Sequence, residues 1–211
     1  MRKWLPGVFI AADVLFTLAV YSSLPDRVAT HFGVHGPDAW SSRAVAAWIL
    51  PALALVLWPV LRFIPRIDPR YSNYAAFRTG YDSVVAGVVL LLVAVHVALL
   101  GYALGWPIPI DAVVSVAVGA LLVRIGMVLP QAKSTWFFGI RTPWTLSNEE
   151  VWARTHRIGG KLMMIAGLLI ALLGFVHSPV AIYTVIIACG AMILFLFPYS
   201  YFVWRALTAG R

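Results

Sequence analysis

Long apolar runs alternate with shorter polar segments along this chain. A run of roughly 20 mainly apolar residues is long enough to cross a lipid bilayer as a helix. The pattern predicts an all-α integral membrane protein with six transmembrane helices. The predicted spans are 4–24, 44–64, 82–104, 111–130, 159–177 and 180–204.

Composition agrees with this pattern. Hydrophobic residues make up 62% of the chain and charged residues only 11%, and the mean hydropathy is +0.89. These values are typical of a chain whose solvent is lipid. The first apolar run continues to about Leu24, longer than the apolar region of a signal peptide, so we interpret it as an uncleaved span. The single cysteine, Cys189, excludes a disulfide within the chain.

The formal net charge of +8 indicates membrane orientation rather than nucleic-acid binding, because the basic residues flank the apolar runs. With the N-terminus in the cytoplasm, only Arg27 and Arg43 lie outside, and Arg124 lies within the fourth span. The other basic residues are cytoplasmic: Arg2, Lys3, Arg62, Arg66, Arg70, Arg78, Lys133, Arg141, Arg154, Arg157, Lys161, Arg205 and Arg211. We therefore expect a multi-pass protein of the bacterial cytoplasmic membrane, with both termini inside.

This topology divides the chain into three predicted units. Residues 1–64 form a two-span unit with an extracellular loop at 25–43. Residues 65–130 hold the third and fourth spans. Residues 131–211 contain a long polar cytoplasmic segment followed by a final two-span hairpin.

The cytoplasmic segment predicts a short amphipathic helix at about 147–158. Ser147 and Glu150 have the spacing of a capping box, and Glu150 has the favourable i, i+4 spacing to Arg154. Trp152 and His156 share a helix face, and Gly159-Gly160 allows a bend before the fifth span. Two interpretations stay open: an interfacial connection with tryptophans at headgroup depth, or a working surface.

The extracellular loop contains His31 and His35, four residues apart. Gly36-Pro37-Asp38 is typical of a turn with proline in its favoured position. The two histidines and Asp38 are weak candidates for a metal site, because no further nitrogen or sulfur ligand is near in sequence. The alternative is a structured loop whose histidines are satisfied by hydrogen bonds.

Three ionisable residues, Asp13, His96 and Arg124, lie within predicted spans. Such groups are costly in lipid and usually face the bundle interior. Asp13 and Arg124 lie at similar depth, so an ion pair between them is one hypothesis. A functional polar cavity is a second, and a protonated Asp13 with Arg124 reaching to the headgroups is a third.

The sequence contains none of the common catalytic motifs: it has no nucleophile elbow, no H-E-x-x-H, no phosphate-binding glycine loop and no C-x-x-C. The sequence therefore predicts no cofactor, and an enzymatic activity is less favoured than a non-enzymatic one.

Two segments together resemble a known family. The cytoplasmic FGIRTPWTLSNEEVWARTHRIGG is similar to the signature of the SdpI family of bacterial membrane immunity proteins. The loop LPDRVATHFGVHGPDAWSS is similar to a domain of unknown function that commonly precedes that signature, with its leucine-proline, histidine-phenylalanine and proline-aspartate pairs at matching places.

The resemblance implies protection against a secreted antimicrobial peptide toxin and capture of a cytoplasmic repressor. It assigns the toxin side to His31, Phe32, His35 and Asp38. It assigns the inner working surface to the signature residues Arg141, Thr142, Pro143, Trp144, Glu150, Trp152, His156 and Arg157. Two other hypotheses stay open: a small transporter built on Asp13, His96 and Arg124, and a membrane enzyme or metal-dependent protein that uses the loop histidines.

Overall fold

The structure is a computed structural model that describes residues 4–33, 36–176 and 179–209. Within these residues it is a helical bundle, with one short β-hairpin between the first two long helices. The elements are α1 (Leu5–Val20), β1 (Arg27–Gly33), β2 (Gly36–Ser42), α2 (Arg43–Ile67), α3 (Arg78–Ala103), α4 (Ile110–Val128), α5 (Pro143–Ser147), α6 (Glu149–Leu173) and α7 (Pro179–Thr208). Short 3-10 turns at Tyr21–Ser23, Tyr71–Phe77 and Leu129–Gln131 join onto α1, α3 and α4.

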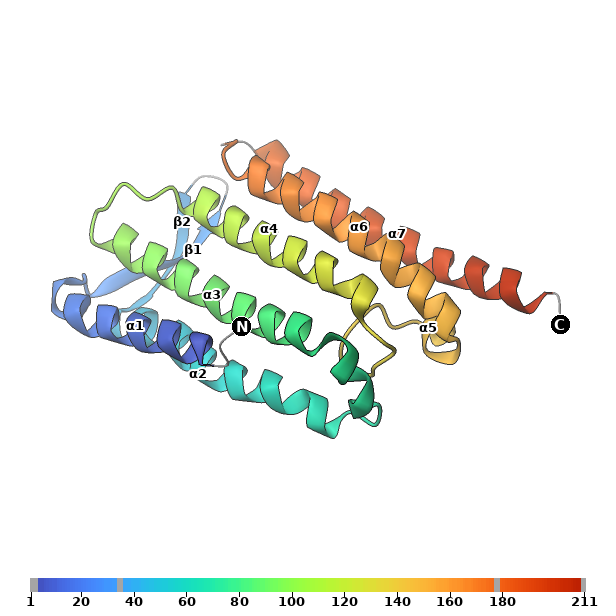
Figure 1. Cartoon of the computed structure of the whole chain (residues 1–211). Helices are drawn as coiled ribbons and strands as arrows, with labels where there is room; N and C mark the ends of the chain where they lie inside the picture. Colours follow the sequence, from blue (N-terminus) through green and yellow to red (C-terminus); the bar gives the residue numbers. More distant parts are fainter. Residues whose placement is uncertain (1–3, 34–35, 177–178, 210–211) are drawn as a thin grey trace.

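Six helices within the described part of the chain are long and apolar enough to cross a membrane. They fall on the six predicted spans, so this prediction is confirmed and the protein is a multi-pass membrane protein (Figure 1). The all-α prediction lacked one element, because strands β1 and β2 pair antiparallel within the predicted extracellular loop.

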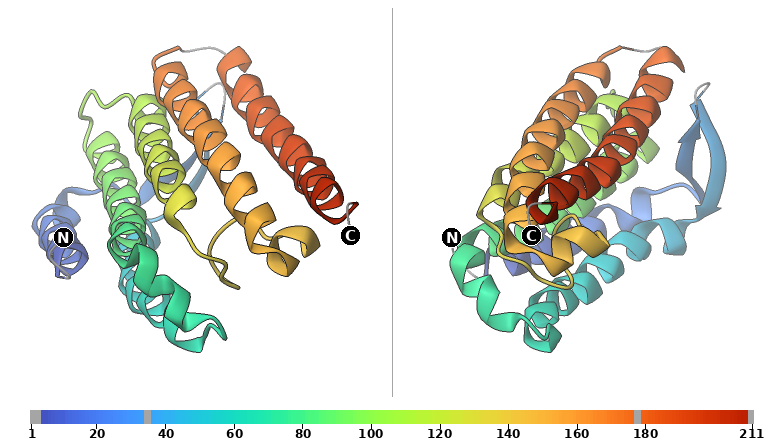
Figure 2. Two further views of the ribbon diagram at one scale, coloured as in Figure 1. Left: turned by 45° about the vertical axis from the view of Figure 1, so that its right-hand side comes forward. Right: turned by 90° about the vertical axis from the view of Figure 1, so that its right-hand side faces the viewer.

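The helices form a series in which each packs on a neighbour (Figure 2). Helix α3 packs against α1, α2 and α4, while α4 packs against α6 and α6 against α7. The hairpin lies where α1 ends and α2 begins, and α5 lies at the opposite end of the bundle (Figure 1). The molecule therefore has two polar ends, and the sequence motifs lie at different ends.

Glycines allow the close contact between α4 and α6. A Cβ on Gly126 would lie 2.6 Å from the Gly160 carbonyl oxygen, and a Cβ on Gly167 would lie 2.6 Å from the Gly119 carbonyl oxygen. Small residues let helix backbones approach closely in membranes, where apolar burial alone does not drive association. The predicted bend at Gly159-Gly160 is wrong, because α6 runs through it as one helix. Gly160 is needed for packing instead.

The predicted separate helix at about 147–158 is wrong for the same reason. Its residues form the first turns of α6, which continues without a break into the fifth span. No residue between Glu150 and Gly160 terminates a helix, and the buried positions continue along the same element. The signature is therefore rigidly attached to a membrane-spanning helix.

The end of α2 and the start of α3 are joined by a hydrogen bond that a proline makes necessary. Pro65 lies within α2 and cannot donate the amide hydrogen that would bond the Leu61 carbonyl one turn earlier. The Tyr81 hydroxyl donates to that carbonyl oxygen at 2.6 Å. Helix-interior proline is tolerated in membranes where a neighbour satisfies the freed group in this way.

Candidate functional site

His156 is the centre of the signature segment, and it is fully buried. Its Nε2 accepts a hydrogen bond from the Ile140 backbone N–H at 2.8 Å. Because a neutral imidazole has one donor and one acceptor, Nδ1 carries the proton and donates to the Trp152 carbonyl oxygen at 2.8 Å. Both ring nitrogens are thus engaged, which leaves His156 no free group for acid–base chemistry or metal binding.

Trp152 completes this centre, and its predicted pairing with His156 on one helix face is confirmed. The two rings stack with centroids 3.9 Å apart, and the indole N–H donates to the Ala132 carbonyl oxygen at 2.8 Å. Gly139 passes over them with φ of +117°, and any Cβ there would overlap both rings. The loop that enters the signature is therefore positioned by buried side chains of α6.

Helix α5 begins with a capping box, although not the predicted one. The Thr142 hydroxyl accepts from the Thr145 N–H at 3.2 Å, and the Thr145 hydroxyl accepts from the Thr142 N–H at 2.8 Å. Pro143 takes the first helical position, where its missing N–H has no consequence.

The predicted capping box of Ser147 with Glu150 is wrong. Asn148 caps α6 instead, with its side-chain oxygen accepting from the N–H groups of Glu150 and Val151. Ser147 belongs to the end of α5 and donates back to the Trp144 carbonyl oxygen. The predicted pair of Glu150 with Arg154 is confirmed, with 2.6 Å between Oε1 and Nε.

Helix α5 is held against α7. The Trp144 ring meets Phe197 and Tyr201 edge to face, with centroids 5.1 and 5.2 Å away. The Thr142 hydroxyl lies 3.0 Å from the Ser200 hydroxyl. Trp144 and Thr142 are therefore packing residues that join the signature to the last helix.

Asp68 fastens the signature to the connection between α2 and α3, and sequence reasoning missed it. Only 2% of this residue is exposed. Its Oδ2 accepts from the N–H groups of Trp136 and Phe137 at 2.9 and 3.3 Å and from the Tyr74 hydroxyl at 3.0 Å. Its Oδ1 accepts from the Arg70 N–H at 2.8 Å. In the sequence, Asp68 is marked only as an isolated acidic residue that follows a helix and precedes a proline.

Neighbours of Asp68 extend this connection. The Arg70 guanidinium donates to the Ser134 hydroxyl and to the Leu146 carbonyl oxygen, and the Asn73 amide donates to the Ser134 carbonyl oxygen at 2.7 Å. Phe138 packs on Phe77, with ring centroids 5.4 Å apart. Segments far apart in the sequence thus form one rigid polar end, on which α5 and the start of α6 are fixed.

The charged signature residues face away from this core. Arg141 is exposed, and its guanidinium donates to the Trp136 carbonyl oxygen at 2.6 Å. Arg154, Arg157 and Lys161 are also exposed, and their spacing places them along one face of α6. We call Arg141, Arg154, Arg157 and Lys161 the basic surface.

The hairpin forms the other polar end. His31 Nδ1 lies 2.5 Å from the Asp38 carboxylate, with 70% and 53% of these side chains exposed. The Phe32 ring meets Tyr102 of α3 edge to face at 5.0 Å. Strand β2 begins at Gly36 and includes Pro37 and Asp38. The turn predicted at these three residues is therefore wrong. Phe32 therefore attaches the hairpin to the bundle, while His31 and Asp38 are accessible.

His35 lies outside the described residues. Within residues 4–33, 36–176 and 179–209, the structure brings no three His, Cys, Asp or Glu side chains together as metal ligands would be. The loop metal site that includes His35 stays a prediction.

The intramembrane residues do not pair as predicted. Asp13 pairs with His96, with 2.8 Å between Oδ1 and Nδ1 and side chains 1% and 0% exposed. Arg124 instead donates from Nε to the Ser83 hydroxyl at 2.7 Å. The prediction of an Asp13–Arg124 pair is wrong because α1 packs on α3, which carries His96, whereas α4 lies on a different side of α3.

Comparisons with known proteins agree with the two sequence motifs. Residues 8–55 match a domain of unknown function (DUF1648), and residues 131–201 match the SdpI/YfhL protein family. The chain is 24% identical to the immunity protein SdpI of Bacillus subtilis (strain 168) over 204 residues, which is 97% of this chain and 96% of that protein. No solved structure matches. The expected resemblance is confirmed: the N-terminal part of this chain is similar to DUF1648, and the C-terminal part is similar to the SdpI/YfhL protein family.

Proposed function

We propose that this protein is a bacterial membrane immunity protein that protects its host from a secreted peptide toxin. The observation that carries the proposal is the similarity to an immunity protein along 97% of the chain. That similarity includes both polar ends of the bundle, the hairpin and the fastened signature.

We further propose that the signature end lies in the cytoplasm, together with both termini. The basic surface lies at that end, as do Arg66, Arg70 and Arg78 at the connection of α2 to α3. An excess of arginine and lysine marks the cytoplasmic side of a membrane protein. The hairpin then faces the toxin, with His31 and Asp38 accessible to it.

Survival of bacteria tests the proposed function. The protein is expressed in a sensitive strain, which is challenged with the secreted peptide toxin of a neighbouring or related operon. We expect more viable cells than with an empty vector at equal cell density. No protection, with the protein shown to be in the membrane, would refute the proposal.

The basic surface is the proposed working surface on which protection depends, through the docking of a cytoplasmic partner. Capture of a repressor is a further proposed role of the same surface. The double variant Arg141→Ala/Arg157→Ala removes two exposed guanidiniums without opening the core. We expect protection to fall at least about tenfold, as for removal of interface residues worth more than 1 kcal/mol each. Viable counts under toxin challenge measure this effect.

The matched control is Arg205→Ala, which removes an exposed basic residue from the last turn of α7. Membrane levels of all variants are compared by immunoblot. Full protection by the double variant at equal level would rule out the basic surface as a working surface.

A proton-coupled transporter is the second candidate function, and the buried pair of Asp13 with His96 favours it. A titratable pair inside a membrane bundle is a common feature of proton pathways. The His96 Nε2 is buried, with no hydrogen-bond partner among the residues described.

Asp13→Asn discriminates between the two functions. The amide fits the same space and can still hydrogen-bond to His96, so we expect a stability change within about 1 kcal/mol. A transporter would lose proton flux at least about tenfold in proteoliposomes that hold a pH-sensitive dye, because an amide cannot take up and release a proton as a carboxyl group does. A non-transporting immunity protein would protect cells equally well with this substitution.

A further inference from the structure

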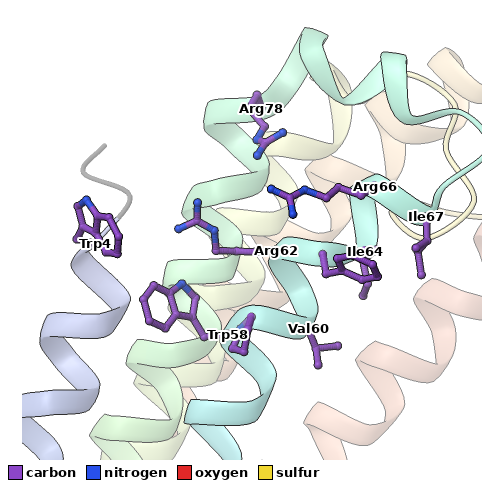
Figure 3. A pocket seen from close by; sticks show the side chains of 10 residues that line it. Trp4, Trp58, Val60, Arg62, Ile64, Arg66, Ile67 and Arg78 are labelled. Carbon is purple, nitrogen blue, oxygen red and sulfur yellow. The ribbon is translucent and has the colours of Figure 1, made fainter.

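A groove of about 660 Å³ opens between the start of α1, the end of α2 and the start of α3. This is the size range of small-molecule sites. Figure 3 shows three arginine side chains gathered around it, with Trp4 and Trp58 beside them. The arginines are Arg62 and Arg66 of α2 and Arg78 of α3. None of these groove residues was a candidate site residue in the sequence analysis.

The charge of this groove is strongly one-sided. Arg62 and Arg66 are four residues apart on α2, and like charges at that spacing destabilise a helix. No acidic residue is among the described residues that line the groove. Asp82 lies nearby and pairs with Arg78 at 3.4 Å between Oδ1 and Nε. The positive charge of the three guanidiniums that line the groove would stabilise an anion bound between them.

The remainder of the lining is apolar. Most of the wall is formed by Trp4, Trp58, Phe63, Ile64 and Ile67. Trp4 is 75% exposed. Tryptophan rings are favoured at the depth of lipid headgroups, and arginine recognises phosphate by paired hydrogen bonds. An occupant must therefore combine an anionic head with an apolar tail.

We propose that this groove binds the headgroup of an anionic phospholipid, with an acyl chain lying along the exposed apolar face of α2. The phosphate lies between Arg62, Arg66 and Arg78, and Trp4 and Trp58 flank the glycerol and upper chain. Clusters of basic residues between membrane helices are a recurrent form of lipid site. The bound lipid joins α1, α2 and α3 at the end of the bundle that also carries Asp68.

The test measures lipid binding to the purified full-length protein. Delipidated protein in a neutral detergent is titrated with dioleoylphosphatidylglycerol or dioleoylphosphatidylcholine, which have the same acyl chains, and bound lipid is counted by native mass spectrometry. Free glycerol 3-phosphate supplies the charged head without a tail. Arg62→Gln/Arg66→Gln is compared with Arg154→Gln/Arg157→Gln, which removes the same charge from the exposed face of α6.

We expect the wild-type protein to bind phosphatidylglycerol at least about tenfold more tightly than phosphatidylcholine. Each guanidinium near an anionic membrane surface raises the affinity about fivefold. The groove variant removes two of them, so its affinity for phosphatidylglycerol should fall about 25-fold. The affinity of the control variant should fall less than about twofold. Equal binding of the two lipids by the wild-type protein overturns the proposal without reference to any variant. Equal loss in both variants also overturns it, and competition by free glycerol 3-phosphate assigns the groove to a soluble phosphate instead.

Discussion

Gly139→Ala will disrupt the packing at the signature end of this protein. The backbone at Gly139 has φ of +117°, a conformation that costs a non-glycine residue about 1–3 kcal/mol. The added Cβ would also overlap the rings of His156 and Trp152, and overpacking of a buried site costs about 1–3 kcal/mol more. The hydrogen bond from Ile140 to His156 would be lost as the loop moves away.

We expect the melting temperature in detergent to fall by about 6–12 °C for about 3 kcal/mol of destabilisation in a protein of this size. Tryptophan fluorescence reports the transition, because Trp152 lies in the affected centre. Gly190→Ala in α7 is the control, since a Cβ there meets open space and alanine is favoured over glycine in a helix. A melting temperature for Gly139→Ala as high as that of the control would show that the centre tolerates a side chain.

Asp68→Asn will have a comparable effect for an electrostatic reason. All of the groups that meet the Asp68 carboxylate are hydrogen-bond donors: three backbone N–H groups and the Tyr74 hydroxyl. An asparagine amide turns its NH2 group toward donors in either orientation. At least one buried donor is then unsatisfied, and the charge-assisted bonds are lost, for about 3 kcal/mol in total.

The expected fall in melting temperature is again about 6–12 °C. Glu150→Gln is the matched control, because its ion pair with Arg154 is exposed at the same end of the bundle and exposed pairs contribute at most about 1 kcal/mol. We expect Asp68→Asn also to lower protection in the survival assay, since Asp68 holds the loop that leads to Arg141. Unchanged stability and protection would mean that Asp68 does not hold the signature in place.

Much of this architecture was predictable from local chemistry. Six apolar runs predict six spans because the bilayer sets the length of each helix. The i, i+4 spacings of Glu150 with Arg154 and of Trp152 with His156 predict contacts because the α-helix repeat is fixed. The two motifs also predict the similarity to the SdpI/YfhL protein family and to DUF1648, since they consist of contiguous residues.

The predicted capping box and the predicted bend are wrong for the same reason. Contacts with neighbouring elements outweigh the conformation that the local sequence favours. Ser147 and Glu150 fit a capping box, but Thr142 starts α5 earlier and leaves Asn148 to cap α6. Gly159 and Gly160 look like a bend, but Gly160 allows contact with Gly126 on α4. Sequence spacing contains no information about which helix lies opposite.

The sequence by itself determined what the bilayer and the helix repeat impose: the number of spans, their approximate ends and the polar segments between them. Only the tertiary structure decided which distant groups meet. It paired Asp13 with His96 rather than with Arg124, placed Asp68 beneath the signature loop, and gathered three arginines around one groove. Pairing across tens of residues depends on the packing of whole helices, whose free energy is distributed over many contacts and is not encoded in any short motif.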